Sequence, residues 1–229
     1  MSHPRFVDIG ACVFDAYGTL FDFNAAAARF EGDLDGKAAQ LSEIWRMKQL
    51  QYTWLRSLMD DYTDFWTVTG EALDFALDAV GIRDEAIRDK LLNAYLTLDA
   101  YPEVPEMLQT LKSAGIRTAI LSNGSPEMLD AAVKGAGLDA LLDASLSVED
   151  VGIYKPHRSV YQLAVDRLGV PAERISFQSS NSWDAVGAAY FGFRVAWCNR
   201  FGQGNEHLPA KPDVQIKTLA ELPGLLGLA

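Results

Sequence analysis

The segment ACVFDAYGTLFD, residues 11–22, places an acid directly after a short apolar run, and a Gly-Thr pair begins three residues after that acid. Residues 11–14 are apolar throughout, which is typical of a strand buried on both faces of a parallel sheet. Asp15 then lies at the carboxyl end of this predicted strand. Open α/β sheets bind ligands beyond the carboxyl ends of their strands, so Asp15 is a candidate functional residue. Taken alone, it could equally be a turn or cap residue.

Five further apolar runs of the same kind follow along the chain, at residues 118–121, 145–147, 175–178, 194–197 and 213–216. Helical patterns lie between most of them. One spans residues 105–114, and another begins at Ser125-Pro126, where a cap residue precedes a first-turn proline. This alternation predicts an α/β fold with a doubly wound, Rossmann-like and mostly parallel sheet.

The alternation is interrupted once, by an insertion of about 80 residues that contains only helical patterns. An amphipathic helix is expected from Leu41 to Leu58, a second from Leu73 to Val80, and a third after the capping residue Asp84. We therefore expect residues 1–23 and 100–229 to form the α/β core and residues 24–99 to form an all-helical cap domain.

Charge composition narrows the class of partner. The 229 residues include 20 Lys and Arg against 31 Asp and Glu, a net charge of −11, which argues against nucleic acid or an anionic membrane surface as a partner. The N-terminal stretch lacks an apolar segment long enough for a signal peptide, and no run approaches a membrane span. A soluble, cytoplasmic protein is expected.

The two cysteines, Cys12 and Cys198, both fall in predicted buried strands. Small hydrophobic residues belong at such positions, and the wide separation of the two is not that of a metal or redox pair. We expect inert thiols in the core.

Polar residues follow several other predicted strands or lie in nearby loops. Ser122-Asn123-Gly124 follows the second strand, Lys155-Pro156 lies in a later loop, and Ser179-Ser180-Asn181 ends the fourth strand with Asp184 close behind. Because the carboxyl ends of parallel strands meet at one edge of the sheet, these clusters and Asp15 predict a single site.

These clusters carry a resemblance to the haloacid dehalogenase superfamily, and within it to the L-2-haloacid dehalogenases. Five ordered blocks spread over nearly the whole chain carry it: FDAYGTLFD at residues 14–22, WRMKQLQYTWLRSLM at 45–59, LSNGS at 121–125, YKPHRSVYQLA at 154–164 and SSNSWDAVGAAYFGF at 179–193. The resemblance implies an aspartyl nucleophile at Asp15.

Two departures from the phosphatases of this superfamily bear on the reaction. Phosphatases carry a second acid two residues after the nucleophile to protonate the leaving alkoxide, whereas this chain has Tyr17 there. They also place a metal-binding acid where this chain has Ser179-Ser180. Asp15 and Asp184 alone would hold Mg²⁺ poorly beside the cationic Lys155. We therefore expect no metal and no cofactor, and displacement at carbon rather than phosphoryl transfer.

The resemblance also assigns roles to the matching positions. Arg46 and Asn123 would cradle the departing halide, and Ser122 and Lys155 would hold the substrate carboxylate. Asp184, with Ser179 and Asn181, would orient Lys155 and the hydrolytic water, while Thr19 would hydrogen-bond Asp15 and Tyr161 would support Lys155 or Asp184. Tyr17, Leu50, Phe65 and Trp183 would wall an apolar substrate pocket. Met47 stands where relatives often have Gln, which bears on the polarity of that pocket.

Each of these residues also has a purely structural interpretation. Arg46 could pair with Glu43 on an exposed helix face, which is the favoured interpretation by spacing alone. Ser122-Asn123-Gly124 is good turn chemistry, and Asp184 suits the first turn of a helix. Aromatic residues such as Phe65 and Tyr161 are more often core than pocket wall.

The expected function is hydrolytic dehalogenation of short L-2-haloalkanoic acids to D-2-hydroxy acids and halide, with inversion, through an ester on Asp15. Three alternatives remain: a Mg²⁺-dependent phosphatase, a hydrolase of another small carboxylate such as a fluorinated acid or a strained ring, and a scaffold that binds an anion or a partner without turnover. Dimerisation through the cap surface of Trp45, Trp54 and Leu58 is also expected from the resemblance.

Overall fold

The computed structural model describes residues 3–23 and 29–228. Its centre is a six-stranded parallel sheet in the order β3-β2-β1-β4-β5-β6. The strands are β1 (Ala11–Phe14), β2 (Arg117–Ser122), β3 (Ala144–Ser147), β4 (Ile175–Ser179), β5 (Arg194–Cys198) and β6 (Val214–Ile216). All six predicted strands are confirmed, with ends that differ by at most one residue. The doubly wound sheet is therefore as expected, with β1 near its middle.

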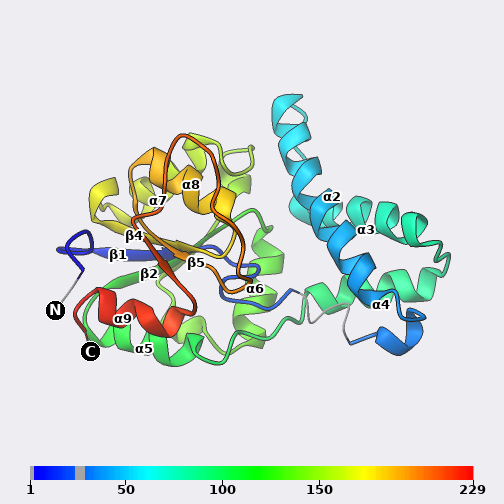
Figure 1. The fold of residues 1–229 in the computed structure, drawn as a ribbon, viewed down its shortest axis with the longest axis horizontal. Coiled ribbons are helices and arrows are strands. Elements are labelled where there is room, and N and C mark those ends of the chain that lie inside the picture. The colour runs from blue at the N-terminus through cyan, green and yellow to red at the C-terminus, as the bar shows by residue number, and fades with distance from the viewer. Residues whose placement is uncertain (1–2, 24–28, 229) are drawn as a thin grey trace.

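Helices cover both faces of this sheet. They are α5 (Val104–Ser113), α6 (Pro126–Gly135), α7 (Arg158–Leu168), α8 (Ser182–Phe191) and α9 (Leu222–Leu225). Figure 1 shows α7 and α8 on one face and α5 and α9 on the other. The predicted start of α6 is confirmed: the Ser125 side chain caps the helix by accepting a hydrogen bond from the Met128 N–H, and Pro126 is its first residue.

Between β1 and α5, the described residues form helices but no strand. The main ones are α2 (Ala38–Leu58), α3 (Phe65–Val80) and α4 (Glu85–Tyr95). The three predicted helices are confirmed, but α3 begins eight residues before the expected Leu73. Asp64 caps this earlier start by accepting from the Thr67 N–H, and packing of Phe65 and Val68 stabilises a first turn of poor intrinsic propensity. Asn24, the expected first residue of the cap, lies outside the described residues.

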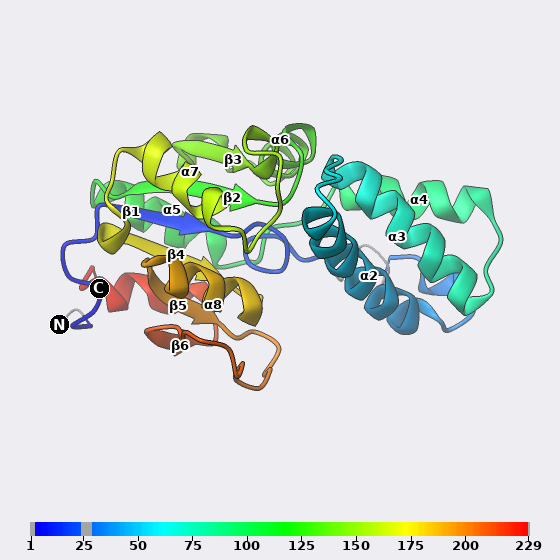
Figure 2. The same ribbon diagram turned by 90° about the horizontal axis from the view of Figure 1, so that it is seen from above.

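The two chain crossings between the sheet and these helices run side by side. The Asp22 N–H donates to the Asp99 carbonyl at 3.0 Å, and Phe21 and Ala100 form an antiparallel bridge. Figure 2 shows α2, α3 and α4 beside the sheet, at the end toward which the strand arrows point. The helical layer therefore faces the carboxyl end of β1, where Asp15 lies.

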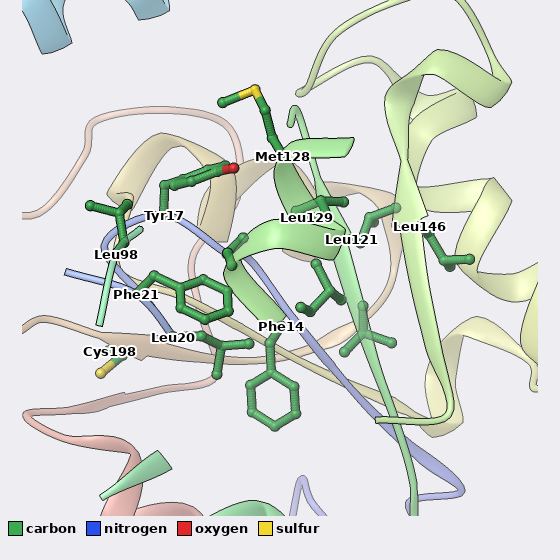
Figure 3. Packing of buried hydrophobic residues seen from close by; sticks show 14 of the residues in the cluster. Phe14, Tyr17, Leu20, Phe21, Leu98, Leu121, Met128, Leu129, Leu146 and Cys198 are labelled. Carbon is green, nitrogen blue, oxygen red and sulfur yellow. The ribbon is translucent and has the colours of Figure 1, made fainter. Parts of the chain in front are cut away.

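The core around this edge is apolar. The loop after β1 contributes Leu20 and Phe21 to it, β2 contributes Leu121 and α6 contributes Leu129, all fully or almost fully buried (Figure 3). Cys12 and Cys198 are buried in β1 and β5, as expected. Among the described helices, none has the length and apolar character needed to cross a membrane.

Candidate active site

Asp15 continues β1 by one residue, because its N–H donates to the Gln178 carbonyl of β4 at 2.9 Å. The residue is only 6% exposed, and three side chains donate to its carboxylate. Lys155 Nζ lies 3.1 Å from Oδ1, while Asn181 Nδ2 and Thr19 Oγ1 lie 2.8 and 3.3 Å from Oδ2. These contacts fix the position and orientation of a buried carboxylate, as attack by a nucleophile requires.

The turn after Asp15 explains the Gly-Thr pair. Gly18 has φ of +87°, a conformation that side-chain-bearing residues rarely adopt, and a Cβ there would lie 3.0 Å from the Phe23 ring. The tight turn brings Thr19 back to the carboxylate. Its hydroxyl also accepts from the Ser180 N–H at 2.8 Å, which joins the loop after β1 to the loop after β4.

Lys155 lies between two acids. Its Nζ is 3.1 Å from Asp15 Oδ1 and 2.9 Å from Asp184 Oδ2, and its side chain is 1% exposed. Burial lowers the pKa of Lys155, but the Asp15 and Asp184 carboxylates outweigh it, so the net shift is upward. The ammonium therefore stays charged and compensates both acids.

Asp184 lies in the first turn of α8 and is fully buried. Burial raises the pKa of its carboxyl and the Asp15 charge adds to the rise, while Lys155 and the Tyr161 hydroxyl act in the opposite direction. The Tyr161 hydroxyl donates to Asp184 Oδ1 at 2.8 Å. Tyr161 was expected to support either Lys155 or Asp184, and its hydroxyl is hydrogen-bonded to Asp184.

Arg46 extends from α2 of the cap to the core. Its Nη1 donates to Gln49 Oε1 at 2.7 Å and its Nη2 to Asn181 Oδ1 at 3.2 Å, with the guanidinium carbon 4.9 Å from the centre of the Phe23 ring. The favoured structural interpretation by spacing, an exposed pair with Glu43, is therefore wrong. Helix spacing allows that pair, but the cap packs this face of α2 against the core.

The serines and Asn123 at the strand ends close turns in the loops around the site. Ser122 Oγ accepts from the Gly124 N–H at 3.0 Å, and Ser179 Oγ accepts from the Asn181 N–H at 3.1 Å. Asn123 Oδ1 accepts from the Lys155 N–H at 3.1 Å and so ties the Lys155 loop to the end of β2. These side chains therefore stabilise the loops that follow β2 and β4, as the structural interpretation expected, and those loops border the site.

Two of the expected wall residues belong to an aromatic cluster. The Tyr17 ring centre lies 6.1 Å from that of Phe65 and 5.4 Å from that of Tyr95, and all three are buried. Burial, reinforced by Tyr95 and Asp15, raises the pKa of Tyr17 well above its ordinary value, although Arg46 lowers it. Tyr17 therefore keeps its proton at any working pH.

The other two wall residues lie at the junction of cap and core. Trp183 of α8 meets Trp54 of α2 edge to face, with ring centres 5.3 Å apart. Leu50 lines a cavity of about 660 Å³ together with Arg46, Met47 and Phe23. Met47, the residue in question for the polarity of the pocket, lines this cavity and is itself exposed.

Gln49, Thr69 and Tyr95 were not predicted to belong to the site. Gln49 is four residues after Trp45 on the buried side of α2, where the pattern calls for an apolar residue. A polar residue at such a position, next to a candidate arginine, was the available signal. Among the described residues, no group of three or more His, Cys, Asp or Glu side chains could hold a metal ion.

A carboxylate at the end of a central strand, paired with lysine and faced by a cap arginine, is typical of capped α/β enzymes that use an aspartate nucleophile. The family model for haloacid dehalogenase-like hydrolases matches residues 9–192. The chain belongs to this family and, within it, to the (S)-2-haloacid dehalogenases.

Individual relatives support this placement. The chain is 48% identical to (S)-2-haloacid dehalogenase 1 of Pseudomonas sp. strain CBS-3, over 95% of this chain and 96% of the relative. A crystal structure of a dehalogenase with an intermediate complex is 47% identical, with a TM-score of 0.94 and coverage of 96% and 97%. The L-2-haloacid dehalogenase of Xanthobacter autotrophicus with chloropropionic acid covalently bound is 38% identical, with a TM-score of 0.89 and coverage of 96% and 98%.

Proposed function

We propose that this protein hydrolyses the carbon–halogen bond of short L-2-haloalkanoic acids and releases D-2-hydroxy acids. The observation that carries the proposal is the buried Asp15 carboxylate, held at one oxygen by Lys155 and at the other by Thr19 and Asn181. The names of the relatives give the substrate class, and the covalently bound acid in one of them supports an ester intermediate.

In the first step, an Asp15 oxygen attacks C2 of the substrate from the side opposite the halogen. A carbon–oxygen bond forms, the carbon–halogen bond breaks, and the halide leaves with the bonding pair. Attack from behind inverts the centre and leaves an ester on Asp15. A fixed, poorly hydrated carboxylate is a usable nucleophile because little water must be displaced from it.

Arg46 is the group best placed to stabilise the halide. Negative charge on the halogen grows only as the bond breaks, so a fixed guanidinium at the cap lowers the energy of the transition state more than that of the bound substrate. Asn123 would assist Arg46 there. Ser122, Lys155 and the backbone N–H groups after Asp15 would hold the substrate carboxylate.

In the second step, water attacks the side-chain carbonyl carbon of the ester rather than C2. The bond between that carbon and the ester oxygen breaks, one proton of the water passes to the departing oxygen and the other is released to solvent, and the hydroxy acid leaves with its inverted configuration. Asp184, buried and hydrogen-bonded by Lys155 and Tyr161, would orient Lys155 and this water together with Ser179 and Asn181. Asp15 is regenerated.

No metal takes part in this scheme. A divalent ion would need the oxygen atoms of Asp15 and Asp184, and the Lys155 ammonium already lies within 3.1 Å of both. A halide also leaves without a proton, so the reaction needs no proton donor at the position where a phosphatase carries an acid. Tyr17, whose pKa is raised well above its ordinary value, can therefore stand there. The geometry favours displacement at carbon over phosphoryl transfer.

The finer assignments belong to the same proposal. Residues 1–23 and 100–229 form the catalytic core, residues 24–99 form the cap that supplies Arg46, Leu50 and Phe65, and the protein works in the cytoplasm as a homodimer. The exposed Trp54 and Leu58 on α2 would meet the second copy. Trp45 does not belong to that surface: it is 4% exposed, donates to the Thr69 carbonyl at 2.9 Å and packs inside its own cap.

The test is turnover of L- and D-2-chloropropionate by purified protein, with and without EDTA, followed by chloride release and product chirality. Chloride from the L form alone, unchanged by the chelator, is expected. Hydrolysis of phosphate esters that stops in EDTA would instead establish the phosphatase.

The covalent route has its own test. In a single turnover in ¹⁸O water with excess enzyme, label should enter Asp15 and leave the first hydroxy acid unlabelled, because water attacks the enzyme's carbonyl carbon. Label found directly in that product would exclude the ester. Asp15→Asn should release no halide, provided that deamidation back to Asp is excluded by mass spectrometry.

A further inference from the structure

A buried hydrogen-bond network meets Arg46 inside the cap. Gln49 lies three residues after Arg46 on α2 and is 1% exposed. Its Oε1 accepts from Arg46 Nη1 at 2.7 Å and from the Tyr95 hydroxyl at 3.2 Å. Its Nε2 donates to Thr69 Oγ1 of α3 at 2.7 Å. One carboxamide therefore joins all three helices of the cap at the arginine.

The hydrogen bond from the Thr69 hydroxyl to the Phe65 carbonyl determines the direction of the other bonds. Thr69 Oγ1 lies 2.6 Å from the Phe65 carbonyl, which can only accept, so the single hydroxyl proton is used there. Toward Gln49 the same oxygen must then accept. Gln49 must present its amide nitrogen to Thr69, which leaves Oε1 for Arg46. A flipped amide would place two N–H groups against the guanidinium.

The same logic continues on the core side of Arg46. A guanidinium can only donate, so Asn181 must present Oδ1 to Arg46 Nη2, at 3.2 Å. Its amide nitrogen is then free to donate to Asp15 Oδ2, at 2.8 Å. An unbroken series of hydrogen bonds, each with a determined direction, thus runs from a carbonyl of α3 to the nucleophile.

We propose that Gln49, oriented by Thr69, is a positioning residue that holds the Arg46 guanidinium for the departing halide and, through Asn181, aligns the Asp15 carboxylate. This inference rests on the proposed function. A neutral carboxamide suits the task because it holds the guanidinium by hydrogen bonds without compensating its charge. A carboxylate at position 49 would form an ion pair and reduce the positive charge available to the halide.

The variant Thr69→Val removes the hydroxyl while keeping the shape of the side chain, and Thr69→Ser keeps the hydroxyl. Without its acceptor, the Gln49 amide is free to rotate and Arg46 loses its fixed partner. Tyr95→Phe removes only the second donor to Oε1 and should act in the same direction more weakly. Thr53→Val is the matched control, since this buried α2 threonine bonds to the Leu50 carbonyl.

The readout is kcat and KM for the L forms of 2-chloro-, 2-bromo- and 2-iodopropionate. Chloride is the poorest leaving group and depends most on Arg46. In Thr69→Val, kcat/KM should fall about tenfold for the chloro acid and only about threefold for the iodo acid, mainly through kcat. Thr69→Ser should restore the wild-type ratio, and Thr53→Val should leave it unchanged. Equal losses for all three halides would overturn the proposal.

Crystal structures of the Thr69→Val and Thr53→Val proteins separate this inference from the proposed function. The guanidinium of Arg46 should be displaced or disordered in the first and unmoved in the second. If the wild-type protein released no halide, the proposed function would fail, yet a displaced Arg46 in Thr69→Val would still support the positioning role. An Arg46 that stays in place would overturn it, whatever the activity.

Discussion

Lys155 and Asp184 form an ion pair with 2.9 Å between Nζ and Oδ2, and both side chains are almost completely buried. Two buried acids, Asp184 and Asp15, share this single ammonium. Removing charges from water is costly, and such a cluster persists only when each member is paired. The stability of the site and its chemistry therefore depend on the same residue.

Replacing Lys155 with Met should abolish halide release and destabilise the fold. The two carboxylates would remain buried without a cation, at a cost of about 3–5 kcal/mol in the free energy of unfolding. In the wild type, the raised pKa of Lys155 contributes stability that is complete below its ordinary value of 10.5 and is lost as pH rises through the folded-state pKa. Urea unfolding at several pH values should show that alkaline loss in the wild type and not in the variant.

Tyr161→Phe should move the acidic limb of the kcat/KM profile to higher pH. The pKa of Asp184 is already raised by burial, and the Tyr161 hydroxyl partly opposes the rise. A folded-state pKa above 3.8 means that stability falls as pH increases from that value through the folded pKa, because the unfolded chain ionises first. In the variant the pKa of Asp184 should be higher still, so the pH range over which stability falls should extend further upward. An unshifted limb would show that Asp184 does not control the profile.

Gly187→Ala should impair the site from the far side of Tyr161. A Cβ at Gly187 would lie 2.5 Å from the Tyr161 hydroxyl oxygen and 2.8 Å from Pro156 Cβ. Overpacking of this kind costs roughly 1–3 kcal/mol and should push the hydroxyl away from Asp184. Adding Tyr161→Phe removes the closest clash, so the double variant should be more stable than the sum of the single effects predicts.

The control for that experiment is Gly135→Ala in α6. Nothing lies within 4 Å of a Cβ there, so the substitution should leave activity unchanged and stabilise the helix slightly. Thermal unfolding of the wild type and the four variants provides the comparison, and an equally harmful Gly135→Ala would point to a general sensitivity of these helices.

Both thiols should resist modification in the folded protein. Burial raises the pKa of Cys12 to about 12 and that of Cys198 to about 11, and only the thiolate reacts rapidly. Titration with DTNB should detect no thiol in the native protein and both after unfolding in guanidinium. Rapid native reaction accompanied by loss of activity would contradict the expectation of inert core residues.

Leu58→Glu should dissociate the proposed homodimer. Leu58 is 82% exposed at the end of α2, close to the exposed Met59, and a buried unpaired carboxylate at an interface is costly. Sedimentation should give twice the 25.1 kDa of one chain for the wild type and one chain for the variant. Tyr190→Glu, at an exposed position of α8, should not change the mass. A monomeric wild type would end the proposal of a dimer.

Local signals in the sequence were sufficient for the sheet and for most of the site. A strand buried on both faces leaves a continuous apolar run, and each run of this chain ends within one residue of the end of its strand. Polar residues that follow such runs must gather at one edge of a parallel sheet, so the sequence alone places Asp15, Asn181 and Asp184 together. Helix caps such as Ser125 depend only on neighbours within one turn, so they could also be predicted from the sequence.

Contacts made across the cap and core could not be derived in this way. An amphipathic helix such as α2 presents one apolar stripe that fits its own neighbours and a second copy equally well, so Trp45 and Trp54 were indistinguishable until packing buried the first. Spacing offered Arg46 the nearby Glu43, but its actual partners are Gln49 and Asn181, and Asn181 is 135 residues away. Periodicity records which face of a helix is apolar, whereas the partner of a long, charged side chain depends on how whole layers dock, and only the tertiary structure contains that information.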